Sequence, residues 1–422
     1  MRVLYDFGIL AQAFDRPAAR TGILRVVEKV AHALAARSDC TVGFTAGESL
    51  GGVVDYLRDH PDLPAAVPHS AAAIAASRWC DPLRRFVWDS AANRSLVFRG
   101  LRWGARRVTE GLEASFTHLS PAKLRGFDIF HAPCSPFPRH IQADTRLRKL
   151  VTIYDLIPLR APEFFGPEVL RVARRRLTEC RRDDTWVLAI SQATKDDLCD
   201  YSGIAPGRVF VTPLAAGAHF YPERDPAVIA AARQRYGIPD GPYLLSVCTL
   251  EPRKNLHSVI AAFASLVEAE KIADLRLVLV GNVGWSYERI FAESARYPEL
   301  RERIVFPGFV PDDDLRAIYS GALAFLYLSV YEGFGLPPLE AMQCGVPTIT
   351  SNVSSLPEVV GDAAIQVPPH DLPAISAAML RLYRDPVARA HFVAAGLARA
   401  RQHSWERCAD ATVAAYRAIL QS

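Results

Sequence analysis

One stretch, residues 322–345, limits what this chain can fold into more than any other. Residues 322–328 are an apolar run without polar alternation, which is typical of a strand buried on both faces of a parallel sheet. Gly333 and Gly335 follow, and then two prolines of the kind accepted in the first turn of a helix. A strand, a glycine loop and a helix in this order present backbone N–H groups and the positive helix end to an anion.

Two carboxylates flank this glycine loop. Glu332 lies on the loop after the strand, and Glu340 lies in the helix that follows, so both face one crevice. A carboxylate beside an anion site needs a hydroxyl partner, and sugars and riboses supply hydroxyls. The alternative is an ordinary strand-to-helix turn in which Glu340 only complements the helix dipole.

The same residues resemble a known family. The spacing from Glu332 to Glu340 matches the E-x7-E signature of the group 1 family of retaining glycosyltransferases (GT4), and the segment GVPTITSNVSSLPEVVGDAA beyond it is similar to that family residue for residue. The resemblance covers nearly the whole second half of the chain and several blocks of the first. It implies an α/β fold of the GT-B type, in which two Rossmann-like domains with doubly wound parallel sheets face each other across a cleft.

Chain length and the resemblance together predict the domain organisation. A chain of 422 residues is long enough for two domains, each with its own core. The turn-rich segment VTPLAAGAHFYPERDP separates two alternating series of strands and helices. We predict an acceptor-binding domain in residues 1–218 and a nucleotide-sugar-binding domain in residues 219–402. A terminal helix in residues 403–422 is expected to cross back to the first domain.

Composition indicates the cellular compartment of the protein and excludes some classes of function. No apolar run approaches the roughly 20 residues that span a bilayer, and the start of the chain does not resemble a signal peptide. The 8 cysteines are scattered without a C-x-x-C pair, which favours reduced thiols over a zinc site or a disulfide framework. A net charge of +4 is only mildly basic for this length. We therefore expect a cytoplasmic protein that does not bind nucleic acid.

A glycine near the start of the chain is a second candidate for substrate contact. Residues 2–6 are typical of a strand, and apolar residues beyond Gly22 fall on one helical face, with Thr21 placed to cap that helix. The segment TGILRVV resembles the family loop that opens toward the acceptor and the donor phosphates, which implies contacts from Gly22 and Arg25. The alternative is a glycine with only a structural role at a helix start.

Further candidates lie where later strands of the first half end. Residues 127–213 contain short apolar runs that end in polar or turn residues, and sites in doubly wound sheets collect at the carboxyl ends of strands. His131 and Asp155 occupy such ends. The segment VTIYDLIPL resembles the family strand that ends in His-Asp beside the donor sugar, and Tyr154 stands where many members have histidine. The alternatives are a helix cap for Asp155 and a hydrogen-bonded, partly buried role for His131.

Two adjacent cations in the second half fit a diphosphate. Thr249, Arg253 and Lys254 belong to the segment TLEPRKN, which follows a predicted strand and precedes a helix. Arginine offers a planar fork of donors and lysine a compact charge. The segment resembles the pyrophosphate-binding block of the family. The alternative is a solvated surface pair.

The resemblance also assigns the remaining donor contacts. It implies that Glu332 holds sugar hydroxyls and that Glu340 accepts from ribose hydroxyls. Backbone and side-chain contacts with the donor are implied for Gly333, Phe334, Gly335, Leu336, Gly281, Asn282 and Val310.

An acidic run, Asp312 to Asp314, superficially looks like a metal-binding D-x-D motif. The run precedes a helical stretch, Leu315 to Tyr319, so we interpret it as N-terminal capping and dipole complement. No other grouping has the spacing of a metal site. We expect catalysis without a metal ion or any other cofactor.

The resemblance implies a catalytic set of Glu332, Arg253, Lys254 and Asp155 and retention of configuration. The expected partners are a nucleotide-sugar donor and a glycan or lipid-linked acceptor. Residues 331–342 and 351–364 look most like bacterial mannosyltransferases of surface-polysaccharide assembly, which favours GDP-mannose as the donor. GDP-fucose, UDP-glucose and dTDP-rhamnose remain alternatives. Another enzyme on the same architecture, or a non-catalytic nucleotide-sugar-binding scaffold, is a rival hypothesis.

Residues 78–107 carry an excess of arginine interleaved with aromatic side chains. This composition is typical of a surface helix that contacts anionic lipid, at the inner face of the plasma membrane. The same composition describes an ordinary amphipathic helix with a solvated face. The segment has no accompanying nucleic-acid-binding motif.

Overall fold

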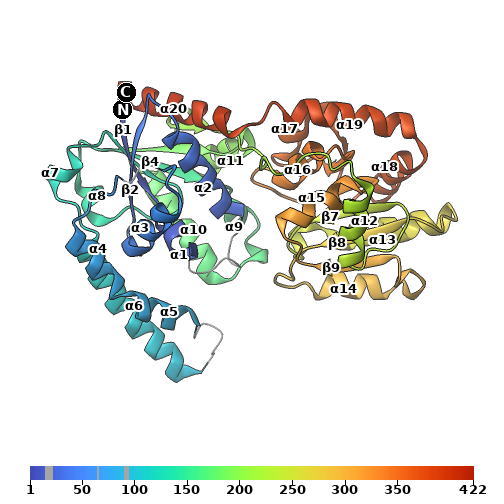
Figure 1. The fold of residues 1–422 in the computed structure, drawn as a ribbon, viewed down its shortest axis with the longest axis horizontal. Coiled ribbons are helices and arrows are strands. Elements are labelled where there is room, and N and C mark those ends of the chain that lie inside the picture. The colour runs from blue at the N-terminus through green and yellow to red at the C-terminus, as the bar shows by residue number, and fades with distance from the viewer. Residues whose placement is uncertain (15–21, 64–65, 90–94) are drawn as a thin grey trace.

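Two parallel sheets form the frame of the protein, as a computed structural model shows (Figure 1). The structure describes residues 1–14, 22–63, 66–89 and 95–422. Within these residues each sheet has six strands, in the orders β2-β1-β3-β4-β5-β6 and β12-β11-β10-β7-β8-β9. The first sheet contains β1 (Arg2–Asp6), β2 (Thr41–Thr45), β3 (Ile129–Ala132), β4 (Arg148–Ile153), β5 (Thr185–Ala189) and β6 (Val209–Val211). The second contains β7 (Tyr243–Val247), β8 (Arg276–Val280), β9 (Ile304–Gly308), β10 (Ala324–Tyr327), β11 (Thr348–Ser351) and β12 (Ile365–Val367).

Helices connect the parallel strands and cover both sheets. Those of the first part are α1 (Gly8–Phe14), α2 (Gly22–Ala35), α3 (Leu50–Asp59), α4 (Ala71–Arg78), α5 (Asp81–Asp89), α6 (Leu96–Phe116), α7 (Pro121–Leu124), α8 (Arg139–Ala143), α9 (Ile157–Arg160), α10 (Pro167–Cys180) and α11 (Gln192–Ser202). Those of the second part are α12 (Pro226–Arg235), α13 (Leu256–Ala269), α14 (Glu288–Ala295), α15 (Asp312–Ser320), α16 (Leu336–Gln343), α17 (Leu356–Val360), α18 (Leu372–Arg384), α19 (Pro386–Ala400) and α20 (Trp405–Gln421).

The strand expected at residues 322–328 is β10, which lies between β11 and β7 in the second sheet. All four of its residues are buried, as its unbroken apolar sequence requires. Because the strands are parallel, the loops after β7, β8, β9 and β10 meet at one edge of the sheet.

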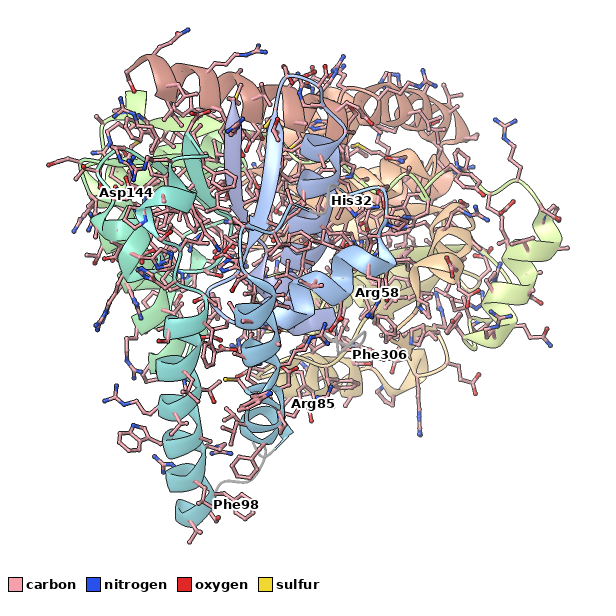
Figure 2. All side chains as sticks on the ribbon, turned by 60° about the vertical axis from the view of Figure 1, so that its left-hand side comes forward. His32, Arg58, Arg85, Phe98, Asp144 and Phe306 are labelled. Atoms are coloured by element: carbon pink, nitrogen blue, oxygen red, sulfur yellow. The ribbon has the colours of Figure 1, made fainter. Side chains whose placement is uncertain are left out.

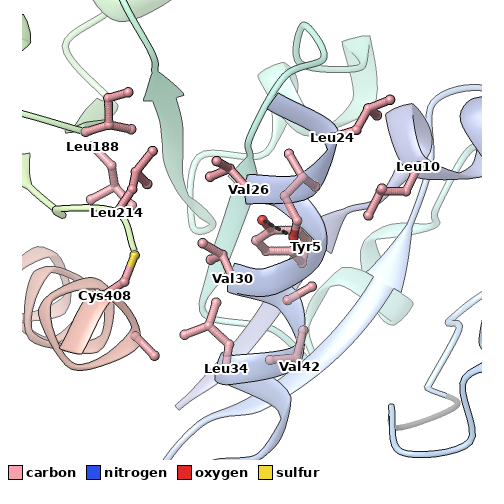
Figure 3. Close-up of a cluster of buried hydrophobic side chains, with 14 of the residues drawn as sticks. Tyr5, Leu10, Leu24, Val26, Val30, Leu34, Val42, Leu188, Leu214 and Cys408 are labelled. Atoms are coloured by element: carbon pink, nitrogen blue, oxygen red, sulfur yellow. Dashed lines mark hydrogen bonds between the residues drawn. The ribbon is translucent and has the colours of Figure 1, made fainter. Parts of the chain in front are cut away.

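The last helix lies against the first sheet rather than the second. Helix α20 packs beside α2, and Figure 3 shows Cys408 of α20 near the apolar face of α2, which carries Val26, Val30 and Leu34 over Tyr5 of β1. Side chains of this size each contribute about 1.5–3 kcal/mol when they leave water. The packing therefore ties the end of the chain to its beginning. The predicted cap of α2, Thr21, lies outside the described residues.

Helices α5 and α6 extend away from the first sheet as an arm of residues 81–89 and 95–116 (Figures 1 and 2). At the base of the arm, buried Arg84 pairs with Asp81 and with fully buried Glu113, which also accepts the backbone N–H of Ser49 at 3.1 Å. Arg84 is thus a buried structural cation, although the sequence suggested a surface role for it. Arg94 of the same basic segment lies outside the described residues.

Three further observations bear on the expectations from composition. No helix in the described part of the chain is both long and apolar enough to cross a bilayer. Among the same residues, no group of three or more His, Cys, Asp or Glu side chains is arranged to hold a metal ion. All eight cysteines carry free thiols.

Candidate active site

The glycine loop joins β10 to α16 and reaches the first sheet. Gly335 has a φ of 124°, a conformation that side chains rarely adopt, and it sits directly before α16. A Cβ on Gly333 would lie 2.1 Å from the backbone carbonyl oxygen of Tyr154, which follows β4. Glycine is therefore required there for the two halves of the molecule to approach. Ser355 Oγ fixes the loop by donating to the carbonyls of Glu332 at 2.9 Å and Phe334 at 2.6 Å.

A buried ion-pair cluster lies at the start of this loop. The Glu332 carboxylate contacts Arg253 Nη1 at 2.9 Å and Lys254 Nζ at 2.5 Å, and Glu332 is only 9% exposed. Lys254 Nζ also donates to the hydroxyl of Tyr327 at 2.8 Å. Arg253 is further held by Glu251 at 2.5 Å and by the carbonyl of Tyr331 at 2.8 Å. The structure thus brings together the two cations and the carboxylate that the sequence selected.

The two cations of the cluster keep the Glu332 carboxylate charged. Burial raises the pKa of Glu332, but the charges of Lys254 and Arg253 outweigh burial and hold that pKa at about 2. Burial also raises the pKa of Asp155, which Arg253 and Lys254 partly counteract. One donor of the cluster, the buried Nε–H of Arg253, has no partner among the described residues. A buried N–H without a partner costs free energy, which a hydrogen bond to an acceptor would recover.

Asp155 lies across from the glycine loop. A Cβ on Gly333 would be 2.9 Å from Asp155 Cβ. The Asp155 carboxylate also accepts the backbone N–H of Ile157, the first residue of α9, at 3.0 Å, although the N-cap residue of that helix is Leu156. Asp155 therefore holds the first N–H group of α9 beside the glycine loop, and its role at the donor sugar stays a prediction.

Glu340 lies in the second turn of α16 and is 6% exposed. One of its oxygens accepts from the hydroxyl of Tyr319 at 3.2 Å, and the other faces Arg25 Nη1 at 3.3 Å. Arg25 comes from α2 of the first half, so it bridges the two halves of the molecule. Its other nitrogen contacts Asp312 at 2.8 Å. Burial raises the pKa of Glu340, and Arg25 works against that rise.

The acidic run before residue 315 differs from the expected arrangement. Helix α15 begins at Asp312 and has Pro311 as its N-cap residue, so the aspartates form the first turn and do not cap it. Asp312 pairs with Arg25 across the two halves, and Asp314 pairs with Arg235 at 2.8 Å. Propensity at helix starts explains the position of these aspartates, but the partner of Asp312 depends on the tertiary fold.

Three neighbouring loops of the second sheet contain the remaining donor candidates. Thr249 is exposed just after β7, and its neighbour Leu250 exchanges backbone hydrogen bonds of 2.9 Å with Asn282 and Gly284 after β8. The backbone N–H of Gly281 donates to Gly308 at 2.9 Å, next to buried Val310 after β9. The loops that carry Thr249, Gly281, Asn282 and Val310 are therefore contiguous.

Gly22 and Leu336 are the first residues of α2 and α16, so both mark helix starts. A Cβ on Gly22 would meet no atom within 4 Å. Packing around Gly22 therefore does not require a glycine at this position.

His131 does not face this group of residues. It is 1% exposed in β3, where its Nδ1 lies 2.7 Å from the Tyr416 hydroxyl and its Nε2 lies 2.8 Å from Thr152 Oγ1. Burial lowers the pKa of His131 to about 3, so the ring is neutral. The position of His131 corrects the expectation of an acceptor contact, because side chains alternate across a strand and this one points into the core beside α20.

Sequence reasoning missed two buried tyrosines whose hydroxyl groups contact charged residues of the candidate site. Tyr319 contacts Glu340, and the hydroxyl of Tyr327 contacts Lys254. Tyr319 lies in a helix of mixed polarity, and Tyr327 ends an apolar strand. Tyr327 ends the strand directly before the loop, and a hydroxyl at the end of a buried strand was the available signal.

Comparison with known proteins identifies the family. A family model described as glycosyl transferases group 1 matches residues 228–399. The O-antigen chain mannosyltransferase B of Escherichia coli is 36% identical over 292 residues, which cover 69% of this chain and 74% of that protein. The chain belongs to the group 1 glycosyltransferases.

Other similarities extend this result. This group 1 glycosyltransferase is 33% identical over 315 residues to the serotype-specific mannosyltransferase WbdA of Escherichia coli, a match that covers 74% of the chain and 38% of that protein. The solved structure of sucrose-phosphate synthase from Thermosynechococcus elongatus aligns with a TM-score of 0.64 at 20% identity, covering 99% of this chain and 98% of the other. This likeness concerns the fold alone. It confirms the predicted α/β fold of the GT-B type with two doubly wound parallel sheets.

Proposed function

We propose that this glycosyltransferase moves mannose from GDP-mannose to a hydroxyl of a glycan or lipid-linked acceptor in bacterial surface-polysaccharide synthesis, with retention of configuration. The observation that carries the proposal is the buried cluster of Glu332, Arg253 and Lys254 at the start of the glycine loop. Support for mannose comes from the mannosyltransferase relatives. Support for a nucleotide-linked donor comes from the contiguous loops that surround the cluster.

The donor diphosphate is assigned to the cations and to the N-terminal end of α16. Arg253 presents its unpaired Nε–H, and Lys254 provides a compact charge. The backbone N–H groups from Gly333 to Leu336 add the positive end of the helix. Glu340 is assigned to the ribose hydroxyls, and Glu332 is assigned to hydroxyls of the sugar.

Transfer requires negative charge to move onto the leaving diphosphate. The acceptor hydroxyl oxygen bonds to the anomeric carbon on the face that the diphosphate leaves, while the bond from that carbon to the phosphate oxygen breaks with its electron pair. The hydroxyl proton passes to the departing phosphate oxygen. Arg253 and Lys254 stabilise the developing charge in a buried site, where such contacts are stronger than in water. The chain itself thus supplies the positive charge, and we propose that no metal ion or other cofactor takes part.

Binding of GDP, UDP, ADP and dTDP, measured by calorimetry without added metal, tests the donor site. We expect GDP to bind selectively and Glu340→Ala to weaken that binding by about tenfold, the loss typical of one charge-assisted hydrogen bond. Glu288→Ala, on the exposed start of α14, is the matched control and retains wild-type affinity. If UDP or dTDP binds instead of GDP, the alternative donors replace GDP-mannose. Absence of binding to all four nucleotides by folded protein contradicts the proposed donor site.

The arm supports peripheral contact with an anionic membrane. Val97, Leu101, Val108 and Leu112 form one exposed stripe along α6 by their helical spacing, and Val97 is 71% exposed. Arginines occupy other faces of the same helix. An apolar stripe beside basic side chains matches a helix that lies in the interface of an anionic leaflet.

Cosedimentation with vesicles that contain phosphatidylglycerol tests this contact. We expect the double variant Leu101→Gln/Leu112→Gln to lose most vesicle binding. Two apolar side chains that leave water when the helix enters the membrane interface contribute several kcal/mol together. Val387→Gln removes an even more exposed apolar side chain from α19 and is expected to bind like wild type. Equal binding of both variants would contradict the contact.

A further inference from the structure

A cavity of about 870 Å³ lies between α6 and α10, at the carboxyl-end edge of the first sheet. Gly8 follows β1, Gly47 follows β2, and Cys134 follows β3, and all three line the cavity. Its walls are completed by the inner side of the arm and by α10. The cavity is large enough for a sugar with a phosphate group.

Arginine dominates the lining of this cavity. Arg176 is committed to structure, since it donates to the carbonyls of Ala132, Cys134, Ser135 and Thr152. Arg106 is paired with Glu110 at 2.8 Å.

Three other lining guanidinium groups, those of Arg107, Arg139 and Arg175, have no carboxylate within 4.0 Å in the part of the chain that the structure describes. They come from α6, α8 and α10, so separate elements place three exposed cations around one space, and one of them, Arg107, also lies 5.5 Å from the centre of the Trp103 ring. Arginine forks are suited to phosphate oxygens, which accept paired hydrogen bonds.

A buried carboxylate adds a second kind of contact. Glu179 of α10 lines the cavity and is 7% exposed, and its Oε2 has no hydrogen-bond partner among the described residues. A buried acceptor of this kind calls for a donor such as a sugar hydroxyl. The cavity therefore combines groups for an anion with a group for a hydroxyl.

The cavity lies next to the candidate active site. A smaller pocket of about 240 Å³ shares Cys134, Val172 and Arg176 with it and extends to Tyr154 and Asp155. Those two residues lie against Gly333 of the glycine loop. A ligand held in the large cavity can thus extend to the place where sugar transfer is proposed.

We propose that this cavity binds the phosphate or diphosphate group of a glycosyl phosphate acceptor, through Arg107, Arg139 and Arg175, while Glu179 accepts a sugar hydroxyl. The proposal rests on the proposed function, because it names the acceptor class of the same transferase. The phosphate can belong to a lipid-linked acceptor or to a free glycosyl phosphate. The exposed apolar stripe of α6 lies on the helix that supplies Arg107, so a lipid tail at this end has an apolar surface beside it.

Calorimetry with the donor site filled by saturating GDP tests the cavity alone. The probes are methyl α-mannoside, mannose 1-phosphate and decyl mannosyl phosphate, of which the second adds the phosphate group and the third adds the tail. We expect mannose 1-phosphate to bind at least about tenfold more tightly than the neutral sugar, and Arg139→Gln/Arg175→Gln to remove that preference. Arg174→Gln, one residue earlier on the same helix and outside the cavity lining, is the matched control and keeps it.

If the decyl compound binds more tightly than mannose 1-phosphate, the phosphate belongs to a lipid-linked acceptor. If the two affinities are equal, it belongs to a free glycosyl phosphate. Equal binding of the neutral and phosphorylated sugars, or an equal loss in Arg174→Gln, overturns the proposal. GDP binding is read in the first titration, so a failure of the donor site is distinguished from a failure of the cavity. Retention of the neutral sugar by Arg139→Gln/Arg175→Gln shows that this variant is folded.

Discussion

Loss of the charge on Lys254 separates the contribution of the ion-pair cluster to folding from its contribution to catalysis. In Lys254→Met, Glu332 keeps Arg253 but loses its 2.5 Å contact with Nζ. The pKa of Glu332 is about 2 in the folded protein against 4.5 ordinarily. That difference corresponds to about 3 kcal/mol of folding free energy, shared between the two cations. We expect the variant to lose about 2 kcal/mol of unfolding free energy at neutral pH.

The pH dependence of this loss has a definite sign. Folding lowers the pKa of Glu332, so the associated stability is present above pH 4.5 and is lost as the pH falls toward 2. Without Lys254 the folded-state pKa moves back toward 4.5. The stability difference between wild type and Lys254→Met therefore shrinks as the pH falls through this window.

Urea unfolding followed by tryptophan fluorescence, together with turnover of GDP-mannose, measures the two effects. We expect turnover of Lys254→Met to fall by at least about tenfold, since one contact to the leaving diphosphate is lost. Adding Glu332→Gln removes a buried carboxylate that has lost one of its two cations, so most of the stability returns without restoring turnover. Lys123→Met, on the exposed end of α7, is the matched control. Near-normal turnover of Lys254→Met, or unchanged stability, would refute the reasoning.

The other predictions concern contacts between the two halves. Gly333→Ala places a Cβ 2.1 Å from the carbonyl of Tyr154, so we expect turnover to fall by about a hundredfold and small-angle scattering to show separated domains. Arg25→Ala removes a cation that lowers the pKa of Glu340, so the acid limit of nucleotide binding, measured by calorimetry across pH, should move to higher pH. Tyr416→Phe deletes the hydroxyl 2.7 Å from His131 and should cost about 1–2 kcal/mol in urea unfolding while leaving kcat unchanged.

Much of the fold was predictable because its signals are local. The apolar run of β10 and the glycines after it predicted the central strand, the loop and α16. Glu332, Arg253 and Lys254 were selected from separate segments, and parallel strands bring those segments to the same sheet edge.

The remainder depended on packing between distant segments. The pairing of Arg25 with Asp312 joins α2 to α15, and no local pattern specifies that contact. The burial of Arg84 likewise depends on Glu113 in the neighbouring helix of the arm. Counting the arginines of a segment does not show which of them will pair with a buried carboxylate. The count in residues 78–107 therefore overstated the surface charge of this segment.

The position of the arm in the chain has a consequence for how such enzymes diversify. Helices α5 and α6 lie between β2 and β3, and their removal or exchange leaves the order of every strand in both sheets unchanged. The residues of the second half that we assign to the donor lie in other segments. An insertion at this point can therefore vary in length and surface independently of the sugar donor. Chimeras that exchange residues 81–116 between family members would redirect the enzyme to a new location or acceptor while conserving its nucleotide-sugar.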